Sequence, residues 1–91
     1  MKIVAIQQVE DCLDGSVVKE VVLDQAINPA FIHHLEQFGN LAYYPHFAKP
    51  FFKLTVAGKV ALKGVQGNTT LRGRFYPPIQ KHLQLLQEWM P

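Results

Sequence analysis

The sequence predicts an α+β fold in two layers, a largely antiparallel sheet with two helices on one face, in the order ββαβββα. Three observations predict it. The stretch 51–75 alternates apolar and polar residues around two glycine-containing turns, which is typical of antiparallel strands joined by hairpins. Prolines at Asn28-Pro29 and Pro77-Pro78 each precede an apolar stripe at helical spacing. The length of 91 residues suits one domain, expected to span residues 1–91.

The N-terminal part of the chain is expected to form a hairpin. Lys2 to Val9 has consecutive apolar residues, which favours a strand in the interior of the sheet over one at its edge. Glu10 to Ser16 is polar and contains Asp14-Gly15, a dipeptide typical of turns. Val17 to Leu23 is rich in β-branched residues, so we expect it to pair with the first strand.

The first helix should begin at Asn28-Pro29, because asparagine is a favoured N-cap and proline is favoured at the first helical position. Gly39 is expected to end it. Asn40 to Tyr44 then reads as a short strand, and a proline-bounded loop leads to the central hairpin. The residues that give this helix its apolar stripe are Phe31, Ile32, Leu35 and Phe38.

The second helix follows the strand-breaking sequence Tyr76-Pro77-Pro78. Its apolar stripe is wide, and a stripe of this width also suits a contact between subunits. The residues of the stripe are Ile79, Leu83, Leu86 and Met90, widened by Leu85 and Trp89.

The register of the central hairpin determines which side chains share a face. A three-residue turn at 57–59 pairs Val56 with Val60 and makes one side of the hairpin apolar, whereas a two-residue turn pairs Val56 with Lys59 and mixes the sides. Because a slip of one residue moves the whole apolar set to the wrong side, burial favours the Val56–Val60 register. This register gathers four cations on the outer face, if the third strand turns its apolar residues inward: Lys53, Lys63, Arg72 and Arg74.

Lys53 and Lys63 then face each other directly, which is unfavourable by up to roughly 1 kcal/mol. A bound anion, an acidic partner or the protein's own carboxylates would offset this repulsion; the alternative is that the long side chains splay into water. The charges of the whole chain are also unevenly divided, with most basic residues in the half that contains these four cations. Residues 1–45 carry two basic and six acidic side chains, and residues 46–91 carry seven basic and one acidic.

The sequence therefore predicts a non-catalytic binding or assembly domain that contacts an acidic partner or another copy of itself. A homo-oligomer is favoured by the opposite charges of the two halves, and by N-terminal strands that are apolar on both faces, of which the helices can cover only one. The basic face and an aromatic-rich loop should make the contact. The expected contact residues are Lys53, Lys63, Arg72, Arg74, Tyr43, Tyr44 and His46.

An alternative function is single-stranded nucleic-acid binding through the same basic face. Cations beside exposed aromatic rings form surfaces that neutralise phosphates and stack bases. The aromatic residues near the face are Tyr43, Tyr44, Phe47, Phe51 and Tyr76.

Metal and thiol chemistry have less support. His33 and His34 are adjacent on a helix and point about 100° apart, unlike the i, i+4 pair that binds one metal. No metal or cofactor is expected. Cys12 is surrounded in the sequence by carboxylates that favour its unreactive thiol form, so pairing with His46 as a catalytic base lacks support. A carrier or redox role at Cys12 is the third hypothesis, and no enzymatic activity is expected.

The composition predicts a cytoplasmic protein that does not enter membranes. The longest apolar runs are a few residues, against the ~20 needed to cross a bilayer. The first residues lack the apolar core of a secretory signal. Cys12 is the only cysteine, so no internal disulfide can form.

Overall fold

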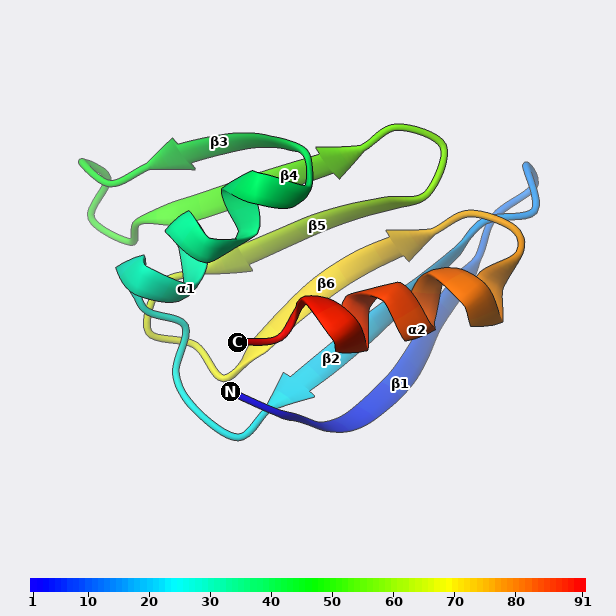
Figure 1. Cartoon of the computed structure of the whole chain (residues 1–91), viewed down its shortest axis with the longest axis horizontal. Helices are drawn as coiled ribbons and strands as arrows, with labels where there is room; N and C mark the ends of the chain where they lie inside the picture. Colours follow the sequence, from blue (N-terminus) through cyan, green and yellow to red (C-terminus); the bar gives the residue numbers. More distant parts are fainter.

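The computed structural model describes all residues, 1–91, and contains one six-stranded antiparallel sheet with two helices on one face (Figure 1). This is the predicted two-layer α+β fold, in the predicted order ββαβββα. Across the sheet the strands lie in the order β1-β2-β6-β5-β4-β3. Their bounds are β1 (Ile3–Asp11), β2 (Val17–Leu23), β3 (Asn40–Tyr44), β4 (Phe51–Val56), β5 (Val60–Val65) and β6 (Thr70–Phe75). The helices are α1 (Pro29–Leu35), continued by the 3-10 turn η1 (Glu36–Phe38), and α2 (Ile79–Trp89).

The β4–β5 hairpin has the predicted register. Val56 pairs with Val60, and Lys53 pairs with Lys63. The Lys59 N–H donates to the Val56 carbonyl oxygen at 3.0 Å, and Gly58 has φ of +73°. A positive φ at the third turn position is what a type II turn requires, so glycine is needed in the middle of this loop.

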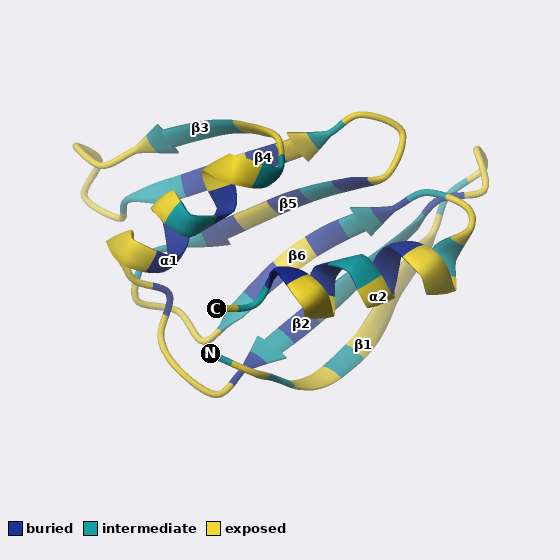
Figure 2. Cartoon of the chain, viewed as in Figure 1, coloured by how far each residue is buried: buried dark blue, intermediate teal, exposed yellow.

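Both helices pack on the same face and contact each other above the middle of the sheet. The rings of Phe38 and Trp89 stack with centroids 5.0 Å apart and planes at 15°. The His34 Nε2–H donates to the Trp89 carbonyl oxygen at 2.6 Å. Below them, buried and more exposed positions alternate along the central strands (Figure 2), and the buried side chains form the core; its fully buried members include Val21, Phe52, Leu54, Leu62 and Phe75.

Helix α1 begins at the predicted residue. It ends at Leu35, and a 3-10 turn continues the chain as far as Gly39, the predicted end. The Asn28 side-chain oxygen accepts a hydrogen bond from the Phe31 N–H at 2.8 Å, which confirms the N-cap. Gly39 follows η1 in an extended conformation, with φ of −179°. Glycine is needed there for close approach, because a Cβ atom would lie 2.6 Å from the Thr55 carbonyl oxygen.

Strand β1 lies at the edge of the sheet, so the prediction of an interior strand was wrong. Register shifts between Ile3 and Ala5 and between Gln8 and Glu10 interrupt its alternation, and Val4 is 60% exposed. Irregularities of this kind are common on edge strands, where they discourage pairing with other chains. Strand β1 is mostly exposed (Figure 2), so it does not need cover on both faces and gives no support to a homo-oligomer.

Candidate anion-binding face

The open face is the side of the sheet opposite the two helices. Neighbouring strands pair in uninterrupted register from β2 to β3, and β1 keeps its register with β2 between its two shifts, so the side chains of this face form rows across the sheet. The central row contains, from β3 to β1, Ala42, Lys53, Lys63, Arg72, Glu20 and Gln7. Three cations thus stand side by side on β4, β5 and β6.

The charges of the central row are only partly balanced. Arg72 Nη2 lies 3.9 Å from Glu20 Oε2, and the two side chains are 55% and 34% exposed. An exposed pair at this distance contributes little stability. Neither Lys53 nor Lys63 has a carboxylate within 4 Å. The two lysines therefore repel each other without a neutralising partner in the chain.

Arg74 lies in the next row, paired with Ala61 on β5 and Val18 on β2. Its guanidinium donates from Nη1 to the hydroxyl oxygen of buried Ser16 at 3.5 Å. Ser16 in turn donates to Asp14 Oδ1 from its hydroxyl at 2.6 Å and from its backbone N–H at 2.9 Å. These two hydrogen bonds, aided by the charge of Arg74, lower the pKa of Asp14. Arg74 is thus partly engaged in holding the β1–β2 hairpin.

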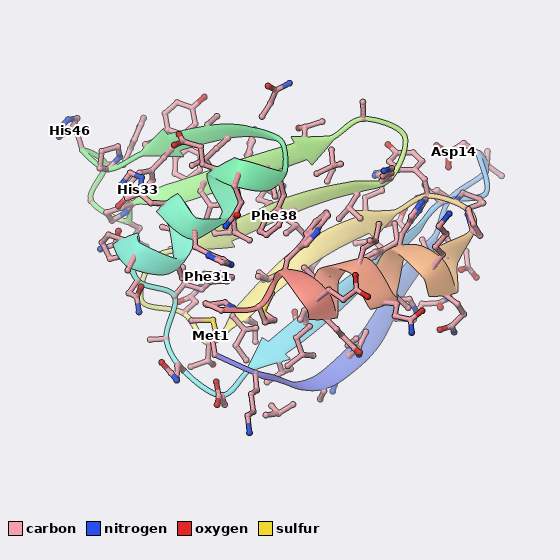
Figure 3. The ribbon with its side chains drawn as sticks, in the orientation of Figure 1. Met1, Asp14, Phe31, His33, Phe38 and His46 are labelled. Carbon is pink, nitrogen blue, oxygen red and sulfur yellow. The ribbon has the colours of Figure 1, made fainter.

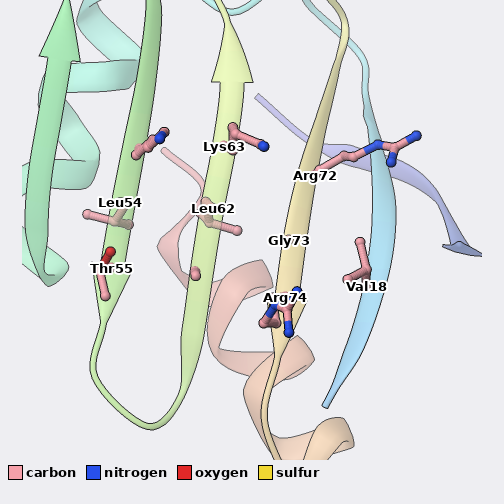
Figure 4. Close-up of a pocket in the computed structure, with 10 residues that line it drawn as sticks. Val18, Leu54, Thr55, Leu62, Lys63, Arg72, Gly73 and Arg74 are labelled. Atoms are coloured by element: carbon pink, nitrogen blue, oxygen red, sulfur yellow. The ribbon is translucent and has the colours of Figure 1, made fainter. Parts of the chain in front are cut away.

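A first hollow of about 320 Å³ lies among the four cations (Figure 4). Lys53, Lys63, Arg72 and Arg74 all line it, and no carboxylate does. Its other outward side chains are short, so the hollow reaches down to the sheet itself at Leu54, Leu62 and Gly73; the short side chains are Val18, Thr55 and Ala61. The first hollow is therefore a concave surface of uniformly positive charge.

A second hollow of about 290 Å³ adjoins the first, and both are lined by Lys63 and Arg72. The second hollow has a different chemistry, with one aromatic ring, an aliphatic wall, and amide, hydroxyl and carboxylate groups. The residues that supply these groups are Phe51, Val65, Asn68, Thr70 and Glu20. The Lys63–Arg72 pair thus separates a purely cationic hollow from a mixed one.

Three aromatic residues form a corner of the open face, which we call the aromatic corner: Tyr44, Phe47 and Phe51. Tyr44 and Phe51 pair across β3 and β4 and stack with centroids 4.7 Å apart. Phe47 comes from the loop between these strands, lies 5.4 Å from the Phe51 ring, and is 59% exposed. Phe51 precedes Lys53 by two residues on the same face of β4, so the corner adjoins the central row.

Five of the seven predicted contact residues lie on this face: Lys53, Lys63, Arg72, Arg74 and Tyr44. Tyr43 points to the helix side, where its hydroxyl donates to Gln66 and its ring meets the His33 ring edge-on. His46 is exposed in the β3–β4 loop. Glu20 and Asn68 were not predicted as part of the site. No local pattern indicates that β2, which carries Glu20, lies beside β6, and none indicates that Asn68, in the β5–β6 turn, lines a hollow.

The groups considered for thiol and metal chemistry are dispersed. Cys12 lies in the β1–β2 turn near Asp14, whereas His46 lies at the opposite end of the molecule, so the two cannot act together (Figure 3). No three side chains among the histidines, cysteine and carboxylates are grouped closely enough to hold a metal ion. Neither helix has the length and apolar character needed to span a membrane.

Comparison with known proteins identifies no relative of this chain. No protein-family model, curated protein or solved structure matches this chain. Its function must therefore be argued from the geometry of the open face.

Proposed function

We propose that this chain is a non-catalytic binding domain that holds an anionic partner on its open face. The observation that carries the proposal is the direct pairing of Lys53 with Lys63, neither of which has a carboxylate within 4 Å. Adjacent strands are about 4.8 Å apart, so Arg72 brings a third positive charge within reach of the same anion. A bound anion attracts both lysines and so offsets the repulsion between them.

The shape of the face supports the same function. Positive charges around a concave surface add, and the low-dielectric wall concentrates their field on whatever occupies the hollow. The first hollow has four cations at its rim, and its depth lets an anion contact several of them at once. Arginine adds a planar donor set that matches phosphate and carboxylate oxygens. The proposal assigns these residues to binding and gives none of them a catalytic role.

The proposal can be tested by titrating the protein with inorganic polyphosphate. We expect binding that weakens steeply with salt, and backbone NMR shifts centred on β4, β5 and β6. The double variant Lys53→Gln/Lys63→Gln should bind at least about tenfold more weakly, because two charge-assisted contacts are lost. The control Lys59→Gln/Lys81→Gln removes the same charge from the 57–59 turn and from α2. Equal loss in both double variants, or no binding by the natural chain, would overturn the proposal.

Self-association is a second candidate, favoured by the tip of the β1–β2 hairpin. Leu13 is fully exposed there, and its neighbours Glu10, Asp11 and Asp14 are exposed acids. This tip complements the open face of another copy, a head-to-tail contact that repeats to give a ring or a filament. Packing two open faces together is disfavoured, since their cations would meet.

Light scattering without added polyanion tests this candidate. Assembly that dissolves at high salt and is lost in Leu13→Asp supports a homo-oligomer built through the hairpin tip. If the chain is a monomer at every salt concentration, self-association is ruled out and the anion-binding proposal is unaffected.

The proposed location is the cytoplasm. Cys12 is the only cysteine and is a free thiol, which suits a reducing compartment. Anion binding at the open face does not use this thiol. Cys12→Ser should therefore leave the affinity for polyphosphate unchanged, and a loss of affinity would instead support a role for the thiol.

A further inference from the structure

We infer that the anionic partner is a single-stranded nucleic acid, an inference that rests on the proposed function. Its phosphates lie in the first hollow and over the central row, and its bases lie in the second hollow and against the aromatic corner. Three features of the open face carry this assignment: the different chemistry of the two hollows, the exposed aromatic rings, and the distance between rings and cations.

The two hollows match the two parts of a nucleotide. The first hollow offers only cations as charged groups, which suits a phosphate. The second offers the Phe51 ring together with the Asn68 amide and the Thr70 hydroxyl, which suits a base, because a base is flat and carries hydrogen-bond donors and acceptors at its edge. Since Lys63 and Arg72 line both hollows, a phosphate and its own base can occupy them together.

The aromatic corner supplies a second stacking position. Tyr44 and Phe47 are large, exposed rings on the open side of the sheet, beside Phe51. A base stacked on such a ring contributes about 1–3 kcal/mol, with little dependence on which base it is. Exposed rings on an antiparallel sheet, with helices on the opposite face, form a recurrent platform for single-stranded RNA.

The spacing of rings and cations fits one continuous strand. Phe51 and Lys53 are two residues apart on the same face of β4, which is about 6.6 Å along a strand. A base on the aromatic corner therefore leaves its phosphate within reach of Lys53, and the next phosphate can follow the central row toward Arg72. A duplex keeps its bases paired and stacked inside, so it cannot use the corner.

The test compares four probes by fluorescence anisotropy, each titrated on the same scale of total negative-charge concentration. The probes are oligothymidylate of roughly 12 nucleotides, the corresponding duplex, polyphosphate and polyglutamate. We expect oligothymidylate to bind most tightly. Phe47→Ala should weaken the binding of oligothymidylate about tenfold and leave the affinity for polyphosphate unchanged, because stacking contributes only to the binding of oligothymidylate. Val4→Ala, which shortens an exposed apolar side chain on β1 at the opposite edge of the sheet, is the control.

Phe47→Trp supplies a direct readout of stacking. The one natural tryptophan, Trp89, is the last residue of α2 and is buried against Phe38, so the new indole reports on the aromatic corner. Oligothymidylate should quench its emission, and polyphosphate should not. Lys53→Gln/Lys63→Gln should lower the affinity for both oligothymidylate and polyphosphate, and it should reduce the salt dependence of oligothymidylate binding.

The outcomes separate this inference from the proposed function. The nucleic-acid inference is wrong if polyphosphate binds and oligothymidylate binds no tighter. It is also wrong if Phe47→Ala leaves the affinity for oligothymidylate unchanged. In both cases the anion-binding proposal stands. Tighter binding of polyglutamate than of either phosphate polymer indicates an acidic protein instead. If no probe binds, the proposed function itself is wrong.

Discussion

Lys53 and Lys63 are paired directly across β4 and β5 on the open face, while Leu54 and Leu62 are paired one step along on the buried face. The second pairing explains the first. Because a strand's side chains alternate between faces, burying the two leucines opposite each other places the two lysines opposite each other. The hydrophobic core therefore sets positions 53 and 63 opposite each other, and a lysine at both positions costs up to about 1 kcal/mol relative to an uncharged pair.

Lys53→Glu should raise the free energy of unfolding by up to about 1 kcal/mol at low salt, because it replaces a cross-strand repulsion with an attraction. The increase should shrink at high salt, where exposed charges are screened. Urea unfolding at two salt concentrations measures both effects. Lys59→Glu makes the same charge change in the turn, away from Lys63, and serves as control. Equal gains in the two variants would show that net charge, and not the pairing, is responsible.

Gly64→Ala should destabilise the fold by about 1–3 kcal/mol, the usual effect of overpacking a core. Gly64 lies opposite Phe52 on the buried face, and a Cβ there would be 2.7 Å from Phe52 Cε1 and 3.1 Å from Ile27 Cδ1. Thermal or urea unfolding gives the loss.

A double-mutant cycle identifies the cause of that loss. Phe52→Leu should recover part of it in the Gly64→Ala background, because the smaller side chain makes room. Gly58→Ala is the control, since a Cβ at Gly58 meets nothing within 4 Å and only its positive φ is unfavourable. Phe52→Leu and Gly58→Ala should therefore be additive. Additivity with Gly64→Ala as well would contradict the overpacking explanation.

The elements of this fold follow from local patterns that the sequence displays. Alternation around the 57–59 turn was enough to predict the hairpin register, because only this register sets the large apolar residues of the two strands opposite each other on one face. The N-cap at Asn28 was equally readable, since the capping residue and the following proline act within one helical turn. The four cations were placed on one face by the same alternation.

The parts that could not be predicted depend on contacts between distant segments. The pairing of β2 with β6 places Glu20 beside Arg72, and neither residue's neighbours in sequence indicate it. The edge position of β1 was missed because its apolar run resembles that of a buried strand. The register shifts at Val4 and at Val9, both of which are exposed, have no evident signal in the sequence. Tyr43 and Tyr44 could not be separated until the register of β3 with β4 was known.

Asn28→Ala should lower the free energy of unfolding by about 0.5–2 kcal/mol, because the Phe31 N–H loses its hydrogen-bond acceptor at the start of α1. Urea unfolding measures the loss. Asn28→Asp keeps an acceptor at the same position and adds a negative charge at the helix N-terminus, so it should retain most of the stability. A loss in Asn28→Asp as large as in Asn28→Ala would mean that the cap is not the source of the effect.

Asp14 should titrate below the usual range of an aspartate. The hydroxyl of Ser16 is the main cause, its backbone N–H is the second, and the charge of Arg74 contributes less. Carboxyl NMR titration should therefore show the pKa of Asp14 rising toward its usual value in Ser16→Ala, and rising less in Arg74→Gln. A larger rise in Arg74→Gln would contradict the assignment to hydrogen bonding.

The same titration predicts how acid affects the β1–β2 hairpin. Because the pKa of Asp14 is lower in the folded chain than in the unfolded chain, ionised Asp14 contributes stability above the unfolded pKa. This contribution is lost as the pH falls through the lower, folded pKa. Asp14→Asn should therefore unfold with less dependence on pH across that acidic range than the natural chain, as measured by urea unfolding at successive pH values. A pH dependence identical to that of the natural chain would show that other carboxylates govern acid unfolding.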